Sequence, residues 1–214
     1  MVLKLHGSPM STCTRRVATV LKEKNVPYEL VTVDMASREH KSAAYLETNP
    51  FGQVPYIDDD GFVLFESRAI ARYIAAKYAG QGTPLLPPPG DLLKLGKFEQ
   101  AASIELSQFD PSTSGLAMEN VFKKRFGLET DQKAVEQYKA TLSGKLDAYE
   151  KILSKSKYLA GDEITLADLF HLPYGSMLKV QGYDYLEDES RPNVVRWWKD
   201  ITSRASWQAV KDGA

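Results

Sequence analysis

Three consecutive prolines, Pro87-Pro88-Pro89, lie in a glycine- and proline-rich segment over residues 80–90, and they constrain the fold more than any other feature. A proline run can neither continue a helix nor donate hydrogen bonds to a β-ladder. Before this run, strand-like and helix-like patterns alternate, and after it the apolar spacing is helical. At 214 residues the chain also exceeds the commonest domain size of about 100 to 150 residues. We therefore predict an α/β domain over 1–79, a linker over 80–90 and an all-helical domain over 91–214.

The pattern before the prolines predicts a small sheet with helices on both faces. Strands are expected over residues 2–6, 28–34, 54–57 and 63–65, and helices over 11–24, 38–46 and 67–78. The last two strands should form a hairpin, because Asp60-Gly61 is a favoured hairpin turn. After the linker, helices are expected over 91–108, 112–126, 131–155, 166–179 and 193–204, with a break at Asp110-Pro111. Thr165 and Asp168 have the spacing of a capping box.

Charge and composition exclude several classes of function. Basic side chains number 27 and acidic ones 28, so no nucleic-acid partner is expected. No window approaches the roughly 18 apolar residues of a spanning helix, and the start of the chain lacks a leader pattern, so no membrane partner is expected. The single Cys13 excludes an internal disulfide and favours the cytoplasm. The three histidines lie far apart in the sequence, which argues against a metal site.

Two short motifs indicate a site for a small peptide. Gln53-Val54-Pro55 begins an extended segment, and a proline there removes a backbone donor and can adopt the cis form. An exposed strand edge of this kind can pair with the backbone of a peptide ligand. Glu66-Ser67 begins a strong helical pattern, which places hydroxyl and N–H groups at a helix N-terminus, where a carboxylate is well received. Together the motifs predict binding of a peptide that has a free carboxylate.

These motifs also carry a resemblance to a known family. The segments Ser8–Arg16, Glu39–Lys41, Asn49–Pro55 and Leu64–Ile70 together resemble the cytosolic glutathione transferases, most closely the phi class of plants. The resemblance covers essentially the full chain. It implies a thioredoxin-like N-terminal domain, an all-helical C-terminal domain and a homodimer. It also implies that glutathione is a cosubstrate and that no cofactor is needed.

The resemblance implies roles for individual residues as well. Ser11 would hydrogen-bond the glutathione sulfur and favour the thiolate, which attacks a hydrophobic electrophile. Other glutathione contacts would come from His40 and Lys41 at the glycyl carboxylate, Gln53, Val54 and Pro55 at the central peptide, and Glu66 and Ser67 at the γ-glutamyl end. The electrophile would lie between Met10 and Met35 in the first domain and Leu116, Met118, Phe122 and Met177 in the second. Reduction of organic hydroperoxides is a further expected activity.

Other interpretations of the same residues stay open. Ser11 could be a helix N-cap alone, although one hydroxyl can both donate to a sulfur and accept from a backbone N–H. Cys13 could form a mixed disulfide with glutathione, as in a thiol transferase or dehydroascorbate reductase. Thr12 would replace Ser11 if the turn were shifted by one residue. Phe51 could insert into a partner subunit or anchor its own loop. A non-enzymatic carrier of apolar small molecules is the alternative from a different class.

Overall fold

The computed structural model describes residues 2–214, which form two compact units. The first unit contains the chain up to Leu86 together with Arg204–Ala214, and the second contains Pro87–Ser203. The proline run therefore starts the second unit. The last segment of the chain packs with the first unit, which the expected boundaries do not anticipate.

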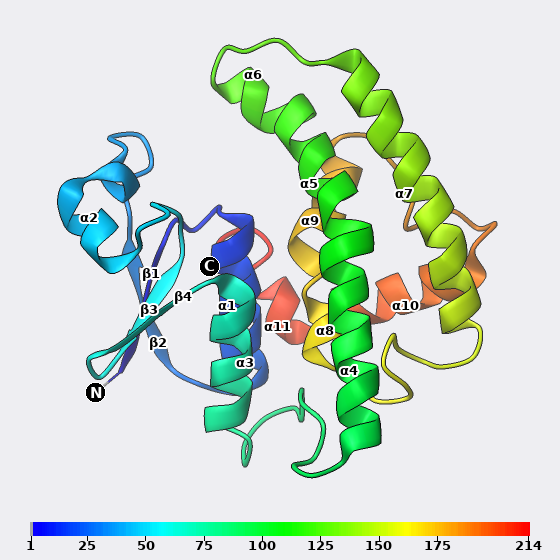
Figure 1. Ribbon diagram of the computed structural model, residues 1–214, viewed down its shortest axis with the longest axis horizontal. Coiled ribbons are helices and arrows are strands. Elements are labelled where there is room, and N and C mark those ends of the chain that lie inside the picture. Colours follow the sequence, from blue (N-terminus) through cyan, green and yellow to red (C-terminus); the bar gives the residue numbers. More distant parts are fainter. Residues whose placement is uncertain (1) are drawn as a thin grey trace. The chain divides into compact units, whose positions relative to one another are not determined.

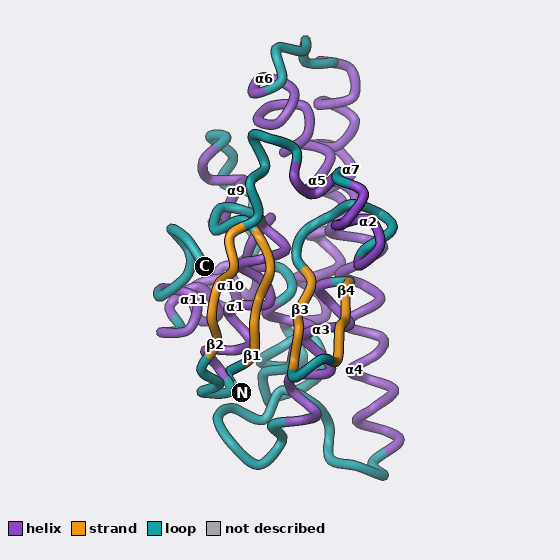
Figure 2. The backbone as a smooth tube through the Cα atoms, turned by 90° about the vertical axis from the view of Figure 1, so that its left-hand side faces the viewer, coloured by secondary structure: helices purple, strands orange, loops and turns teal. Residues whose placement is uncertain are grey.

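The first unit is built on a four-stranded mixed sheet with the strand order β2-β1-β3-β4 (Figure 2). Its strands are β1 (Leu3–Gly7), β2 (Tyr28–Thr32), β3 (Tyr56–Asp59) and β4 (Phe62–Phe65). β2 is parallel to β1, whereas β3 is antiparallel to both β1 and β4. The turn from β3 to β4 has Asp60 and Gly61 at φ values of 57° and 87°. Positive φ at both positions is what a type I′ turn requires, so the predicted hairpin is confirmed.

Helices cover both faces of this sheet, as predicted. They are α1 (Thr12–Glu23), α2 (Ala43–Thr48), α3 (Ser67–Lys77) and α11 (Ala205–Gln208), with a 3-10 turn, η1 (Glu39–Lys41). α1 and α3 pack together on one face, and α2 lies over the other (Figure 1). Strand alternation divides β1 accordingly: Leu3 and Leu5 are buried, while His6 stacks on Tyr56 with ring centroids 4.3 Å apart. Tyr45 of α2 contacts the ring of Tyr56 edge-on.

The core of the first unit holds α1 and α3 against the sheet. Val17, Val20 and Leu21 recur at helical spacing on α1, and Ile70 and Ile74 do so on α3; all five are fully buried. Burying such a side chain contributes about 1.5 to 3 kcal/mol. This packing fixes the position of the first turn of α1, where Ser11 and Thr12 lie.

The second unit consists of helices. They are α4 (Leu92–Ile104), α5 (Asp110–Ala117), α6 (Lys123–Arg125), α7 (Gln132–Leu153), α8 (Leu166–Leu169), α9 (Leu172–Val180) and α10 (Pro192–Ser203), with π-helical segments η2 (Glu105–Phe109) and η3 (Met118–Phe122). The expected break at Asp110-Pro111 is wrong, because η2 connects α4 directly to α5. Proline lacks the N–H of an α-helical bond and clashes with the carbonyl four residues earlier. A wider π-turn before Pro111 accommodates that residue.

Two polar clusters hold the helices of this unit together. The predicted capping box of Thr165 and Asp168 is confirmed, and buried Asp168 also accepts hydrogen bonds from Trp197 Nε1 at 3.0 Å and from the Leu159 N–H at 3.1 Å.

Tyr149 donates its hydroxyl proton to His171 Nε2 at 2.9 Å. Because His171 Nδ1 lies 2.8 Å from a backbone carbonyl, which can only accept, the ring carries its proton on Nδ1.

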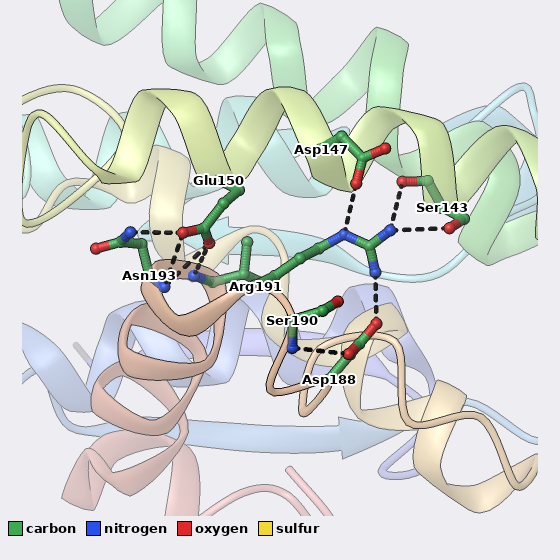
Figure 3. Close-up of polar contacts among 8 residues, drawn as sticks. Ser143, Asp147, Glu150, Asp188, Ser190, Arg191 and Asn193 are labelled. Atoms are coloured by element: carbon green, nitrogen blue, oxygen red, sulfur yellow. Dashed lines mark hydrogen bonds and ion pairs between the residues drawn. The ribbon is translucent and has the colours of Figure 1, made fainter.

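The second cluster surrounds Arg191, just before α10 (Figure 3). Its guanidinium group donates to Asp147 at 2.8 Å, to Asp188 at 2.9 Å and to the Ser143 hydroxyl at 2.9 Å. Next to it, Glu150 of α7 accepts from the backbone N–H groups at the start of α10, including that of Val194 at 3.0 Å. The carboxylate therefore caps α10 from a neighbouring helix.

Candidate active site

The strand register brings three segments to one end of the sheet in the first unit. His6 near the end of β1 pairs with Tyr56 at the start of β3, and Tyr56 pairs with Phe65 at the end of β4. The residues after β1, before β3 and after β4 therefore emerge at the same end (Figure 2). These segments contain Ser11, the Gln53–Pro55 motif and the Glu66-Ser67 pair, which are far apart in the sequence.

Ser11 is the N-cap of α1. Its Oγ accepts a hydrogen bond from the Thr14 N–H at 3.3 Å, and its own N–H donates to the Ser8 carbonyl at 3.0 Å. The side chain is half-buried, and within the described chain its hydroxyl proton has no acceptor. The N-cap interpretation is thus confirmed. A donor proton remains available for a ligand atom next to the first turn of α1.

Close packing joins this turn to the Gln53–Pro55 motif. A Cβ atom on Gly7 would lie 2.5 Å from Thr14 Oγ1 and 3.3 Å from Pro55 Cβ. Only a glycine therefore allows both segments to approach β1 so closely. The Val54–Pro55 peptide bond is cis. In the residues that the structure describes, the N–H and carbonyl of Val54 form no hydrogen bond, so both can pair with a peptide.

Two side chains that the sequence reasoning missed hold the Gln53 backbone in place. The Tyr45 hydroxyl and the Asn49 amide both donate to the Gln53 carbonyl, each at 2.8 Å. Asn49 also forms the turn of its own loop, because its Oδ1 accepts from the Phe51 N–H at 3.2 Å. Asn49 directly precedes Pro50, and Gly52 follows two residues after that proline. This combination is a turn signal, so the role of Asn49 could have been predicted from the sequence. Nothing local indicated Tyr45.

His40 and Lys41 lie beside the same loop. Gly52, at φ 57°, has so little space that a Cβ atom would lie 2.7 Å from the His40 carbonyl oxygen and 2.9 Å from Lys41 Nζ. Lys41 Nζ donates to the Phe51 carbonyl at 3.1 Å. Burial and, after it, the charges of Lys41 and Arg38 lower the pKa of His40. The imidazole is therefore neutral at neutral pH, and Lys41 supplies the positive charge beside the loop that contains Gly52.

Buried Nδ1 of His40 has no hydrogen-bond partner among the described residues. A buried polar atom without a partner costs free energy unless a ligand or water satisfies it. His40 can therefore offer a neutral hydrogen-bonding group next to the ammonium group of Lys41.

Glu66 and Ser67 form the start of α3. Glu66 has φ 72°, an uncommon conformation for a residue with a side chain, and its side chain is exposed. Ser67 is buried, and its Oγ accepts a hydrogen bond from Arg16 Nη1 at 2.9 Å. Arg16 lies on α1, so this contact ties the two helix N-termini together. The sequence reasoning did not identify Arg16, because its position next to Arg15 resembles an ordinary charged surface.

Cys13 is half-buried in the first turn of α1. Its Sγ accepts a hydrogen bond from Arg16 Nη1 at 3.4 Å. This contact places a guanidinium group beside the sulfur, and it bears on the redox alternative. Thr12 is buried, with 7% of its surface exposed.

The six residues expected to contact the electrophile are distributed over both units. Met10 and Met35 are exposed in the first unit, and Met118 is exposed in the second. Phe122 and Met177 are half-buried. Leu116 has no exposed surface, so it is a core residue of the helical unit and offers no surface to a ligand.

In the described part of the chain, no group of three or more His, Cys, Asp or Glu side chains could hold a metal ion. None of its helices is both long and apolar enough to cross a membrane.

The topology and the site define a class of protein. A mixed sheet in the order β2-β1-β3-β4 with α1, α2 and α3 is a thioredoxin-like domain, and here an all-helical unit follows it. This combination is the fold of the glutathione transferases, as sequence analysis predicted.

Comparisons with known proteins agree. Residues 1–76 match the family described as glutathione S-transferase, N-terminal domain, and residues 106–205 match glutathione S-transferase, C-terminal domain. Glutathione S-transferase PM239X14 of Arabidopsis thaliana is 50% identical over 200 residues, which cover 92% of this chain and 90% of the relative. The chain therefore belongs to the glutathione S-transferase family of enzymes, and the identification made from the motifs is confirmed.

Solved structures are similar over nearly the whole length. Glutathione transferase F7 from Populus trichocarpa has a TM-score of 0.92 at 40% identity, with 99% of this chain and 98% of that chain covered. Glutathione S-transferase I from maize, solved in complex with an atrazine glutathione conjugate, has a TM-score of 0.88 at 36% identity, with 99% and 97% covered. The F-class plant relatives agree with the predicted phi-class resemblance.

Proposed function

We propose that this chain conjugates the thiolate of glutathione to hydrophobic electrophiles, with Ser11 as the hydrogen-bond donor to the sulfur. The observation that carries the proposal is the capping geometry of Ser11. Its oxygen accepts from the Thr14 N–H, and its proton has no acceptor within the described chain. The hydroxyl can therefore donate to a sulfur anion without giving up its structural role.

The energy that this donor must supply is moderate. A thiol with a pKa of about 8.5 is only a few per cent ionised at neutral pH, although the thiolate is the attacking form. Lowering its pKa by about two units requires roughly 2.7 kcal/mol. A hydrogen bond to a charged group contributes about 1.5 to 3 kcal/mol, and a helix N-terminus about 0.3 to 1 kcal/mol. Ser11 and the N-terminus of α1 suffice together.

The rest of the site is suited to a tripeptide with charged ends. The unpaired backbone of Val54 would pair with the central peptide of glutathione. Lys41, with His40 beside it, would bind the glycyl carboxylate. At the start of α3, the first N–H groups and Ser67 would receive the γ-glutamyl carboxylate, while the exposed Glu66 would bind its ammonium group.

The electrophile would contact exposed or half-buried apolar side chains, for which Met10, Met35, Met118, Phe122 and Met177 are the candidates. Thioether side chains adapt to varied apolar shapes, which suits broad specificity. The same thiolate could attack an organic hydroperoxide, which breaks the O–O bond, releases the alcohol and leaves glutathione sulfenic acid. A second glutathione would then reduce the sulfenic acid and give glutathione disulfide and water. Peroxidase activity is thus the second reaction that we propose for this site.

A conjugation assay with a chloronitrobenzene tests the proposal on wild type, Ser11→Ala and Cys13→Ser. We expect the Ser11→Ala rate to fall at least tenfold, while Cys13→Ser keeps the wild-type rate. Full activity of Ser11→Ala would contradict the role of Ser11. Binding of the apolar substrate without turnover by the wild type would instead indicate a carrier.

One contact favours a second candidate function. Arg16 Nη1 donates to Cys13 Sγ. Cys13 could therefore attack a disulfide between glutathione and a substrate thiol: the substrate thiol would leave, and Cys13 would hold the glutathione as a mixed disulfide, as in thiol transferases. The two functions make opposite predictions: Cys13→Ser would abolish thiol transfer and leave conjugation intact. Assaying both reactions on both variants separates them.

We also propose that the enzyme is a cytoplasmic homodimer. Phe51 has 65% of its surface exposed, and Leu92 and Leu93 of α4 have 76% and 86% exposed. Large exposed apolar side chains of this kind are typical of an interface. Sedimentation should show a dimer that Phe51→Ala weakens. The free thiol of Cys13 suits a reducing compartment, which cell fractionation can test.

A further inference from the structure

Residues 204–214, which we call the 204–214 segment, lie along α1 within the first unit. The helix α11 of this segment packs against α1 (Figure 1). Arg204 and Ser206 both donate to the Glu23 carboxylate at 2.5 Å, so the start of the segment is fixed at the end of α1. Trp207 follows and is buried, with 2% of its surface exposed.

Arg15 of α1 holds the middle of the 204–214 segment. Its Nη1 donates to the Lys211 carbonyl at 2.6 Å, and its guanidinium carbon lies 5.7 Å from the centroid of the Trp207 ring. A hydrogen bond from a charged donor is stronger than a neutral one, and a cation over an indole ring adds to the attraction. Because Arg15 is itself buried, water competes little for the same carbonyl.

The far part of the segment reaches the turn that precedes Ser11. The Ser11 N–H donates to the Ser8 carbonyl at 3.0 Å, which closes a four-residue turn with Pro9 in its second position. The Ala214 N–H donates to the Pro9 carbonyl at 3.1 Å. Within the described residues, this carbonyl accepts from Ala214 alone. The 204–214 segment therefore holds the central peptide of the turn, between Pro9 and Met10.

The central peptide of a turn decides how the chain leaves it. Types I and II hold this peptide in opposite orientations, and φ of the third residue changes from negative to positive between them. Met10 is not among the residues with positive φ, so the turn is not of type II. The bond from Ser11 to Ser8 is compatible with either type, whereas the bond from Ala214 fixes the orientation of the Pro9 carbonyl. Rotation of this peptide would change the direction in which Ser11 enters α1.

We propose that Arg15 and the 204–214 segment position the Ser11 hydroxyl for the glutathione sulfur. Arg15 fixes the segment, the segment fixes the peptide between Pro9 and Met10, and this peptide sets the orientation of Ser11. The inference rests on the proposed function, since it names groups that support the same donor. Position matters because a hydrogen bond weakens steeply as its angle departs from linearity.

Hydrogen exchange of the free protein, followed by NMR, tests the geometry without any catalysis. Arg15→Gln and Ala214→Pro each remove a contact of the segment, so the N–H groups of Ser11 and Thr14 should exchange about three- to tenfold faster. Arg15→Lys keeps a cationic donor and Ala214→Ser keeps the N–H, so both should exchange close to the wild-type rate. Lys211→Ala is the matched control, because it removes a side chain and leaves the carbonyl that Arg15 binds. Unchanged exchange in both Arg15→Gln and Ala214→Pro would overturn the proposal.

The pKa of bound glutathione, measured by ultraviolet absorbance of the thiolate, tests the effect on the chemistry. Arg15→Gln and Ala214→Pro should each raise this pKa by about half a unit, less than the loss of the hydroxyl itself. In a Ser11→Ala background, Arg15→Gln should add no further shift, because the segment acts through the hydroxyl. An equal added shift in that background would overturn the proposal.

The same titrations separate this inference from the proposed function. If Ser11→Ala shifts the thiol pKa while Arg15→Gln and Ala214→Pro leave it at the wild-type value, only the role of the 204–214 segment is refuted. If Ser11→Ala titrates like the wild type, the proposed function is refuted, and the role of Arg15 in positioning the donor is refuted with it.

Discussion

The Oγ atom of Ser11 accepts a hydrogen bond from the backbone N–H of Thr14 at 3.3 Å. This contact fixes the side chain at the start of α1 and uses a lone pair of the oxygen, which leaves the hydroxyl proton for another partner. Capping and the proposed donation to the glutathione sulfur are therefore compatible in one orientation of the side chain. A variant of Ser11 should affect both the stability of α1 and the ionisation of a bound thiol.

The Ser11→Ala variant should raise the pKa of the glutathione thiol in the binary complex by about one to two units, because the donor to the thiolate is lost while the N-terminus of α1 stays. Ultraviolet absorbance of the bound thiolate, followed as a function of pH, measures this shift. Loss of the cap should separately lower the free energy of unfolding by about 1 kcal/mol.

Ser11→Thr is the matched control, since it keeps a hydroxyl that can cap and donate; it should titrate like the wild type. If Ser11→Ala left the thiolate titration unchanged, the donor would have to be Thr12 or Cys13.

Gly52 and Gly61 offer a second test, because both have positive φ but differ in their surroundings. A Cβ atom on Gly52 would lie 2.7 Å from the His40 carbonyl oxygen, whereas one on Gly61 would meet nothing within 4 Å. Gly52→Ala should displace His40 and Lys41 and raise the KM for glutathione about tenfold, the equivalent of about 1.4 kcal/mol of lost binding. Steady-state kinetics with varied glutathione measures it.

Gly61→Ala is the control for backbone strain alone, and it should cost about 1 kcal/mol of stability without changing the KM for glutathione. Equal KM effects for the two variants would show that Gly52 has no special role in holding the site.

The features that could be predicted from the sequence are those that depend on neighbours in the chain. The turn at Asp60-Gly61, the cap at Ser11 and the capping box of Thr165 and Asp168 each involve residues at most three positions apart. Their chemistry is local, so the residue types suffice. The motif at Gln53–Pro55 was found for the same reason.

Contacts between distant segments could not be predicted in this way. Arg16 meets Ser67, 51 residues later, only because α1 and α3 pack on one face of the sheet. Arg204 reaches Glu23 across 181 residues of sequence. The break expected at Pro111 failed for another reason: a proline ends an α-helix, but a π-turn before it lets the helix axis continue. Helix propensity alone does not distinguish a proline that ends a helix from one that follows a π-turn within a continuing helix.

Glu23 makes the stability of the first unit dependent on pH. Its carboxylate accepts from Arg204 Nε at 2.5 Å, from Arg204 Nη2 at 2.7 Å and from the Ser206 hydroxyl at 2.5 Å. Burial acts to raise the pKa of Glu23, but the hydrogen bonds from Arg204, Ser206 and Thr83 outweigh it and leave the pKa below the ordinary 4.5. A lowered pKa stabilises the folded state above the unfolded value, and this stabilisation is lost as pH falls toward the folded value.

We therefore expect the free energy of unfolding to decrease in acid, starting near the ordinary pKa of 4.5. Glu23→Gln should flatten this dependence and cost about 2 kcal/mol at neutral pH, less than the roughly 3 to 5 for breaking a fully buried pair. The expected cost is smaller than for a fully buried pair because the Arg204 side chain is 25% exposed. Urea denaturation at a series of pH values measures it, with exposed Glu47→Gln as the control. A parallel acid dependence in Glu23→Gln would assign the effect to other carboxylates.

Asp168 should contribute more to stability than any surface acid of the helical unit. Its carboxylate accepts hydrogen bonds from the N–H groups of Leu159 and Thr165 and from Trp197 Nε1, and it has no exposed surface. Asp168→Ala would leave these donors buried without partners, at about 1 to 3 kcal/mol each before relaxation. We therefore expect the free energy of unfolding, measured by urea denaturation, to fall by about 3 kcal/mol.

Asp162→Ala is the control, because Asp162 also accepts from a backbone N–H, that of Lys157, but is exposed to solvent. Water can replace that acceptor, so the control should lose less than about 1 kcal/mol. Equal losses in the two variants would mean that the cluster around Asp168 relaxes freely and that burial does not set its contribution.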